Sequence, residues 1–323
     1  MTSRQKALIT GANGFVGGWL SATLQQRGCE VHGLDLQPAA RYPERCTYRQ
    51  IDITAENEVA DAIGTIQPDT IYHLAGMSYL PDADHSPKRS IDSNISGTLS
   101  LLDAAKNSVP RSRIVLIGSS KEYNGAINSD GIRESTRPYP TNFYGITKYA
   151  GELLGVQYHR QYGLDVRCTR SFNHTGPGQS PKFVCSDWAR QIALISLGRA
   201  EPELTVGDIG VTIDFSDVRD VVNAYIAIVE TGTPGEVYNV CSGSGISLNW
   251  ILDYLCSKAT VTVSVRYLDE KKREYQSNKR IIGSHQKLTG ETGWQPRIPF
   301  EQTLDDLYSW WMDTLRNLPG QEK

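Results

Sequence analysis

The stretch LITGANGFVGGWL, residues 8–20, places four glycines where an apolar run gives way to helical spacing. A glycine at such a strand-to-helix turn permits a tight bend, a second gives a diphosphate room against the backbone, and a third lets helix and sheet pack closely. The helix that begins here aims its free N–H groups and its positive end at the phosphates. The stretch therefore predicts the dinucleotide cradle of a Rossmann-type sheet.

Strand-like and helix-like segments alternate through the first half of the chain. Six apolar or β-branched runs predict strands: Lys6–Thr10, Glu30–Asp35, Thr47–Asp52, Thr70–Leu74, Arg113–Ser119 and Asp165–Ser171. Four intervening segments have helical spacing: Gly14–Arg27, Glu56–Ile66, Lys88–Asn107 and Asn142–Gln161. Alternation of this kind is typical of a doubly wound parallel sheet with helices on both faces.

The pattern changes after residue 172. The segment FNHTGPGQSPKF, residues 172–183, is polar and rich in glycine and proline, so we expect an irregular loop. The elements expected beyond it are shorter: helices near Phe183–Leu197, Val218–Thr231, Leu248–Lys258 and Glu301–Leu315, and a strand at Val237–Val240. We therefore expect an α/β protein with an NAD-binding domain over residues 1–172. A smaller α/β C-terminal substrate-binding lobe over residues 173–323 completes it, with some elements crossing between the two.

Composition excludes several functional classes. The 323 residues carry 33 Lys and Arg against 36 Asp and Glu, without a basic block that would favour nucleic acid or an anionic membrane. The six cysteines lie far apart and form no C-x-x-C pair, so we expect no metal site and no disulfide framework. The N-terminal residues show no apolar signal core, and no run approaches the roughly 18 apolar residues of a membrane span. We expect a cytoplasmic protein.

The second predicted strand ends in an acidic residue, Asp35. A carboxylate there accepts hydrogen bonds from the adenosine ribose hydroxyls and repels a 2'-phosphate, which predicts NAD(H) in preference to NADP(H). Asp52 and Ile53, at the end of the third strand, are expected beside the adenine. The alternative for Asp52 is a helix cap before Glu56.

The glycines predict a bound cofactor but do not indicate the reaction. We assign the reaction to a tyrosine, a lysine and a serine at the end of a strand. Tyr144 and Lys148 are four residues apart in a predicted helix and therefore share a face. We expect the ammonium to bring the phenol pKa down from about 10, so that Tyr144 can exchange a proton with a hydroxyl or ketone. The fifth strand ends in Ser119 and Ser120, whose hydroxyls can share that proton traffic. A capping or turn role is the alternative for this pair, more plausibly for Ser119.

The order of these motifs resembles the extended short-chain dehydrogenase/reductase superfamily, in the NAD-dependent epimerase/dehydratase family that acts on nucleotide sugars. The glycine spacing G-x-x-G-x-x-G, the motif Tyr72–Gly76 (YHLAG) and the Tyr-x-x-x-Lys pair carry the resemblance, which covers almost the whole chain. Asn94 matches a family asparagine that supports the helix beside the active site. On this resemblance Ser120, Tyr144 and Lys148 are the catalytic residues.

Segments of the second lobe narrow the resemblance to GDP-4-keto-6-deoxy-D-mannose reductases. They are SFNHTGPGQ (171–179), FVCSDWARQIA (183–193), VGDIGVTIDFSDVRDVVNAY (206–225), GEVYNVCSG (235–243) and TGWQPRIP (292–299). The resemblance implies reduction of the C4 ketone of a GDP-4-keto-6-deoxyhexose with NAD(P)H to a GDP-D-rhamnose type product. The chain departs from the family pattern at Ile213, where a diphosphate-facing arginine is usual, at Arg273-Glu274 for a family Arg-Pro, and at Ser171 for a proline.

The pattern and the resemblance together give a full set of expected contacts. The expected cofactor-binding residues are Gly11, Asn13, Gly14, Phe15, Val16, Gly17, Asp35, Leu36, Asp52, Ile53, Leu74, Ala75, Gly76, Tyr144, Lys148 and Phe172. The expected substrate-binding residues are Ser120, Glu122, Tyr144, Asn173, Lys182, Phe183, Val184 and Arg273. Asn173 is expected to hold the diphosphate, with Lys182 or Arg273 replacing the missing arginine.

Three alternatives stay open. Ser120-Lys121-Glu122 has the spacing of the Thr-x-Glu of sugar 4,6-dehydratases, in which the glutamate removes the C5 proton. A 4-epimerase is chemically close, and both of these classes retain their NAD. A non-catalytic NAD-binding regulator is a third reading, which the presence of both Tyr144 and Lys148 disfavours. The resemblance also implies a homodimer through the helices near Lys88–Asn107 and Asn142–Gln161.

Overall fold

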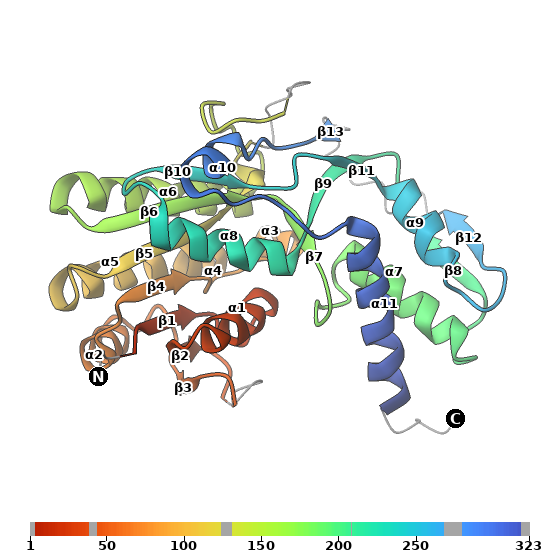
Figure 1. Ribbon diagram of the computed structural model, residues 1–323, viewed down its shortest axis with the longest axis horizontal. Helices are drawn as coiled ribbons and strands as arrows, with labels where there is room; N and C mark the ends of the chain where they lie inside the picture. Colours follow the sequence, from red (N-terminus) through yellow and green to blue (C-terminus); the bar gives the residue numbers. More distant parts are fainter. Residues whose placement is uncertain (1–3, 39–43, 124–130, 208, 268–279, 318–323) are drawn as a thin grey trace.

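The computed structural model describes residues 4–38, 44–123, 131–207, 209–267 and 280–317. Its centre is a seven-stranded parallel sheet in the order β3-β2-β1-β4-β5-β6-β10 (Figure 1). The strands are β1 (Lys6–Thr10), β2 (Glu30–Asp35), β3 (Thr47–Gln50), β4 (Thr70–His73), β5 (Arg113–Ser119), β6 (Asp165–Ser171) and β10 (Val237–Val240). The Rossmann-type fold expected from the sequence is confirmed.

Helices cover both faces of this sheet, which explains why its strands are apolar on both sides. On one face α1 (Phe15–Gln26), α8 (Val218–Thr231) and α10 (Gln286–Thr292) pack over a core that includes Leu20 and Tyr225. On the other face α2 (Glu56–Ile66), α5 (Gly97–Ser108) and α6 (Phe143–Tyr162) enclose a second core. No helix among the described residues is long and apolar enough to cross a membrane.

The second lobe has a hydrophobic core of its own. The helices α7 (Val184–Ser196), α9 (Leu248–Cys256) and α11 (Phe300–Asn317) enclose it together with the paired strands β8 (Glu203–Val206) and β12 (Ser264–Tyr267). In Figure 1 these elements lie together to the right of the large sheet. A small sheet lies between the two parts: β7 (Asn173–Thr175), β9 (Thr212–Asp217), β11 (Gly245–Ser247) and β13 (Arg280–Ile281).

The structure adds to or differs from the sequence expectation in several places. Part of the segment 172–183, expected to be irregular, forms β7, because Asn173–Thr175 pair in parallel with Phe215–Asp217 of β9. The helix expected over Lys88–Asn107 is divided into α4 (Pro87–Ile91), a π-helical turn at Asp92–Ser96, and α5. A short helix, α3 (Leu80–His85), precedes it. Finally, β10 completes the large sheet beside β6, so the chain returns to that sheet after residue 173.

Candidate active site

The glycine turn has the close approach that its sequence predicts. The Gly11 N–H donates to the Leu34 carbonyl at 2.8 Å, and Gly11 has a φ of 73°. A Cβ at Gly11 would lie 2.9 Å from the Ala75 nitrogen, and one at Gly17 would lie 2.3 Å from the Gly11 oxygen. Helix α1 begins at Phe15 with no side chain capping it, which leaves its first N–H groups for a ligand. The backbone therefore fits a dinucleotide diphosphate.

Asp35 stands at the carboxyl end of β2, beside this turn. Its carboxylate accepts the Asn13 N–H at 3.0 Å and the Gln37 N–H at 3.1 Å. The Tyr48 hydroxyl hydrogen bonds both the Gln37 carbonyl and the Asn13 side-chain amide, the latter at 3.0 Å. The neighbouring Leu36 side chain is exposed. These contacts orient the carboxylate at the edge where the adenosine ribose is expected.

The two residues expected to flank the adenine differ in their surroundings. Asp52 accepts the Thr54 N–H at 2.9 Å and the Thr54 hydroxyl at 2.8 Å, a turn that leads into α2. Ile53 is buried and packs so closely on Gly97 that a Cβ there would lie 2.6 Å from it. The N-cap of α2 is Ala55 and no side chain among the described residues caps the helix, so these bonds of Asp52 form a turn and not the helix cap considered as its alternative.

Residues that follow two further strands extend the expected cofactor groove. Leu74, Ala75 and Gly76 follow β4, where the Ala75 N–H donates to the Thr10 hydroxyl at 3.1 Å. Phe172 follows β6, but its side chain is buried in a small core with Tyr123, Ile132 and Cys241. A contact between Phe172 and a cofactor would therefore involve its backbone.

Helix α6 carries Tyr144 and Lys148 on one face, toward the end of β5. The helix is capped by Asn142, whose side chain accepts the Gly145 N–H at 2.8 Å. The Lys148 ammonium donates to the Ile117 carbonyl at 2.9 Å. Behind the helix, the Asn94 amide donates to the Thr147 hydroxyl at 2.9 Å, so the π-helical turn supports this part of α6.

The protonation of this pair departs from our sequence expectation. Burial raises the pKa of Tyr144 to about 12, although a hydrogen bond with the Ser119 side chain acts in the opposite direction. Burial lowers the pKa of Lys148 to about 8. The expected lowering of the phenol pKa by the ammonium is absent because Lys148 is directed to the Ile117 carbonyl. At neutral pH Tyr144 is therefore a protonated phenol, the form that can donate a proton.

The two serines at the end of β5 have different surroundings. The Ser119 hydroxyl, bonded to Tyr144, also accepts the Lys121 N–H at 3.2 Å, while the Ser119 N–H donates to the Glu122 carboxylate at 2.8 Å. This reciprocal pattern is a capping box on the 3₁₀ turn Ser120–Tyr123. Ser120 is buried, and its hydroxyl has no hydrogen-bond partner among the described residues.

Ser119 is the residue of this site that sequence reasoning undervalued. We assigned the catalytic role to Ser120 and considered a capping role more plausible for Ser119, whereas the structure gives Ser119 that cap together with a hydrogen bond to Tyr144. The S-x-x-E pattern of Ser119 and Glu122 was the signal for the cap. Which of the two serines meets the phenol could not be predicted from the sequence, because it depends on how α6 packs against β5.

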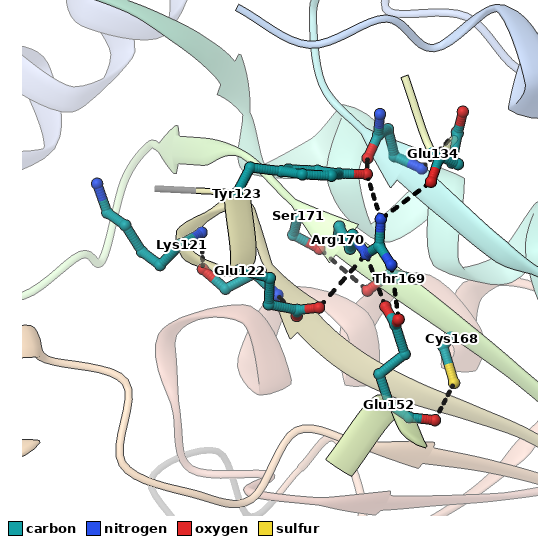
Figure 2. A network of polar contacts seen from close by, with 11 residues as sticks. Lys121, Glu122, Tyr123, Glu134, Glu152, Cys168, Thr169, Arg170 and Ser171 are labelled. Atoms are coloured by element: carbon teal, nitrogen blue, oxygen red, sulfur yellow. Dashed lines mark hydrogen bonds and ion pairs between the residues drawn. The ribbon is translucent and has the colours of Figure 1, made fainter. Parts of the chain in front are cut away.

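Glu122 is directed into the protein. Figure 2 shows its carboxyl group pointing toward Arg170 and Glu152, whereas the neighbouring Lys121 extends the opposite way. One carboxyl oxygen takes part in the capping box, and the other lies 3.4 Å from the Arg170 Nε. The side chain has no exposed surface, so the substrate contact expected for Glu122 is not available in this structure.

Arg170 of β6 is the centre of this polar network. Its guanidinium donates to the two carboxylate oxygens of Glu152 at 2.7 and 2.6 Å, and to the Tyr123 hydroxyl at 2.6 Å (Figure 2). Two carboxyl groups thus face one guanidinium. Burial, and after it the nearby Glu152 charge, raise the pKa of Glu122 well above its usual range, although the Ser119 N–H and the Arg170 charge act in the opposite direction.

Gly118 is required beside this network. A Cβ at Gly118 would lie 2.5 Å from the Glu122 carboxyl and 2.2 Å from the Thr169 carbonyl. The last residues of β5 are therefore shaped to admit the glutamate side chain beneath the strand end. The absence of a side chain at Gly118 is therefore part of what makes this network possible.

The residues expected to bind substrate lie on the segment that enters the second lobe. Asn173 begins β7, and its side-chain amide has no hydrogen-bond partner among the described residues. Lys182 instead donates to Asp82 of α3 at 3.0 Å and lies over the Tyr79 ring. Phe183 packs edge-on against the same Tyr79 ring, and Val184 begins α7.

Two further positions bear on how a diphosphate could be bound. Ile213 is in β9, opposite Ile246 of β11, in the small sheet between the two parts. Arg273 lies outside the described residues. Lys182 was expected to supply a cation for the diphosphate, but its ammonium group is paired with Asp82 in this structure.

Comparison with known proteins agrees with this geometry. The family model described as GDP-mannose 4,6 dehydratase matches residues 8–307. A GDP-6-deoxy-D-mannose reductase of Pseudomonas aeruginosa is 35% identical, over 97% of this chain and 99% of the relative. A GDP-mannose 4,6-dehydratase of Yersinia enterocolitica is 25% identical, over 94% of this chain and 92% of the relative. The solved structure of RMD from Pseudomonas aeruginosa complexed with NADPH superposes with a TM-score of 0.83 and 34% identity, covering 96% of this chain and 99% of that one.

Proposed function

The chain belongs to the GDP-mannose 4,6 dehydratase family, within the extended short-chain dehydrogenases/reductases, and from that premise we propose that it reduces a nucleotide-linked 4-keto-6-deoxyhexose. The proposed substrate is GDP-4-keto-6-deoxymannose, and the product is of the GDP-D-rhamnose type. The 35% identity to a GDP-6-deoxy-D-mannose reductase supports this choice over the dehydratase at 25%.

The position of Glu122 is the observation that carries the proposal. A 4,6-dehydratase needs this carboxylate at C5 of the sugar, ionised and exposed to the substrate. Here the carboxyl group is buried and held by Ser119 and Arg170, and burial raises its pKa, which disfavours the ionised form that a base at C5 requires. Reduction at C4 needs no base at C5, so this arrangement suits a reductase.

The residues present suffice for the protein's part in such a reduction. A nicotinamide cofactor held by the glycine turn supplies the hydride. Tyr144, protonated at neutral pH, donates its proton to the alkoxide that forms at C4. Ser120, whose hydroxyl is unengaged among the described residues, hydrogen bonds the same oxygen. Lys148 holds a positive charge beside the reacting groups and binds the nicotinamide ribose.

Substitution of Glu122 separates the two reactions. A Glu122→Gln side chain can still accept from the Ser119 N–H and resembles the neutral acid, so we expect reductase kcat to stay within about threefold of wild type, less than one neutral hydrogen bond is worth. The control is Tyr144→Phe, which should bind NADH normally and lose several orders of magnitude in kcat. Loss of activity in Glu122→Gln comparable to that in Tyr144→Phe would show that the Glu122 carboxyl group takes part in the reaction and would contradict the role given to it here.

We also propose that NADH is preferred over NADPH, supported by the Asp35 carboxylate at the end of β2. The similar Pseudomonas aeruginosa structure is a complex with NADPH, so the proposed preference of this chain rests on Asp35 alone. An Asp35→Ser substitution should improve kcat/KM with NADPH relative to NADH by at least tenfold, since it removes the charge that repels a 2'-phosphate. Equal selectivity in both proteins, measured from initial rates, would contradict this assignment.

A homodimer is proposed on the same premise. Exposed apolar side chains lie on the outer faces of α4, α5 and α6: Ile91, Leu99, Phe143, Ile146 and Leu153. Apolar side chains gathered in this way are typical of a protein interface. A cytoplasmic location is proposed from the six cysteines, all of them free thiols.

A further inference from the structure

The segment Phe172–Gln179 lies against the helix that begins the cofactor site. The Trp19 indole N–H of α1 donates to the Pro177 carbonyl at 2.9 Å. Four residues earlier on the same helix, the Phe15 ring stacks on the His174 ring, with centroids 6.3 Å apart and an interplanar angle of 12°. Two side chains on one face of α1 thus hold this segment, which we call the substrate loop.

The fit between the substrate loop and its surroundings is close at Gly176. This residue has a φ of 155°, and a Cβ there would lie 2.8 Å from a methyl carbon of Val218 and 3.9 Å from the Phe15 ring. Within the loop, the His174 ring is held by the Phe172 carbonyl at 2.9 Å. The loop backbone is therefore fitted against α1 and the start of α8.

The far end of the substrate loop is anchored to the second lobe. The Gln179 side chain donates to the His174 carbonyl at 2.9 Å and accepts from the Thr175 hydroxyl at 2.6 Å. The Gln179 carbonyl accepts the Ser186 hydroxyl at 2.7 Å, and that hydroxyl in turn accepts the Trp311 indole N–H at 3.0 Å. A continuous series of contacts leads from α1 through the loop to α7 and α11.

We propose that Trp19 is a positioning residue for the nucleotide sugar. The inference rests on the proposed function, because Asn173 of the substrate loop is the residue proposed to hold the diphosphate. With the far end of the loop fixed in the second lobe, the indole bond fixes its near end to the cofactor helix. Trp19 therefore sets the distance between the diphosphate site and the cofactor, and it is not among the residues expected to contact either ligand.

The test is a Trp19→Phe substitution, which removes the indole N–H and keeps an aromatic ring. Loss of one neutral hydrogen bond should raise the Kd for GDP and the KM for the nucleotide sugar about two- to tenfold. The Kd for NADH and the melting temperature should stay near those of wild type. Calorimetric titration with GDP and with NADH measures the two Kd values separately. Trp250→Phe on α9, outside these contacts, is the matched control and should change neither Kd.

A second variant, Gly176→Ala, displaces the substrate loop from its other side, through the clash with Val218. It should weaken GDP binding more than Trp19→Phe while NADH binding is again retained. If Trp19→Phe loses GDP and NADH affinity equally and also has a lower melting temperature, Trp19 only supports the fold. Unchanged Kd values in both variants would show that the position of the substrate loop does not depend on these contacts. Either result overturns the proposal.

The nucleotide itself separates this inference from the proposed function. Titration of wild type with GDP, UDP and dTDP identifies the base, and binding of UDP or dTDP alone would contradict the GDP-linked substrate. The Trp19→Phe comparison is then made with the nucleotide that binds, where the same selective loss is expected. Binding of none of the three would contradict both proposals.

Discussion

At the scale of single residues, neighbouring side chains of one type have separate tasks in this site. Ser119 bonds Tyr144 and caps a turn, whereas the next serine has a hydroxyl with no partner among the described residues. A sequence motif gives the type of group at a strand end. Which of two adjacent hydroxyls meets the phenol depends on the direction of each Cα–Cβ bond, and that direction comes from the packing of α6 on β5.

Lys148 is held in its charged form at a cost in stability. Burial lowers its pKa from the usual 10.5 to about 8. Below pH 8 the group is charged in both the folded and unfolded states, and the folded state bears the cost. Between pH 8 and 10.5 the unfolded state binds more protons at this group, so the contribution of Lys148 to stability becomes more favourable as the pH rises across this range.

A Lys148→Met substitution removes this cost along with one hydrogen bond to the Ile117 carbonyl. At pH 7 we expect the free energy of unfolding to rise by about 1–2 kcal/mol, since the relief exceeds the bond's worth of about 1 kcal/mol. The advantage over wild type should shrink toward pH 10, while turnover is lost at every pH. Urea denaturation at several pH values measures the difference, and a variant less stable than wild type at pH 7 would contradict the account.

At the scale of elements, α6 serves the active site with one face and presents apolar side chains to solvent on another. Tyr144, Lys148 and Glu152 recur every four residues on the face toward β5 and β6, while Ile146 and Leu153 are exposed. Glu152 lies one turn further along the same face of α6, where its carboxylate pairs with Arg170 of β6. The helix is thereby fixed at the point where its catalytic side chains must be held.

The two glutamates beside Arg170 should respond differently to the same chemical change. Glu152→Gln breaks a buried bidentate pair and should destabilise the protein by about 3–5 kcal/mol, because it leaves the guanidinium without its charge partner. Glu122→Gln keeps an acceptor for the Ser119 N–H and changes a group that lies 3.4 Å from the guanidinium, so it should cost less than about 1 kcal/mol. Urea denaturation of both variants measures this difference. Equal losses would mean that Glu122 is ionised and shares the ion pair.

Sequence periodicity predicted most elements of the large sheet and missed those that depend on distant pairing. The bounds of β1, β2, β5, β6 and β10 agree with prediction, because apolar or β-branched residues recur within each of these strands. The strand β7 has no such signal, since its three residues are extended only by pairing with β9, some 40 residues later. The π-helical turn at Asn94 was likewise hidden inside a helical pattern. Among site residues, Tyr144 and Lys148 could be predicted from spacing, but the buried position of Glu122 could not.

At the scale of the whole molecule, the site lies where two cores meet. The large sheet supplies the glycine turn, the strand-end serines and α6, and the second lobe is joined to it through the substrate loop. The place of β10 beside β6 could not be read from its position in the sequence, because strand order is a property of the assembled sheet. Beyond residue 173 the chain contributes elements both to the large sheet and to the second lobe.

The proposed dimer is tested by placing a charge on its expected contact face. Leu153→Glu introduces a carboxylate on the exposed face of α6, which a paired helix could not accommodate without burying a charge. We expect light scattering after size exclusion to give a dimer for wild type and a monomer for the variant, with the melting temperature little changed. A dimer in both proteins would place the interface elsewhere.

The most direct measurement of the central claim is the stoichiometry of the nicotinamide cofactor. Purified protein is mixed with NADH and GDP-4-keto-6-deoxymannose, the absorbance at about 340 nm is followed, and the sugar product is identified by NMR. A reductase oxidises one NADH for each sugar reduced, and the product has a hydroxyl at C4. Conversion of nucleotide sugar with no net consumption of NADH would show a retained cofactor, as in a dehydratase or an epimerase, and would contradict the account.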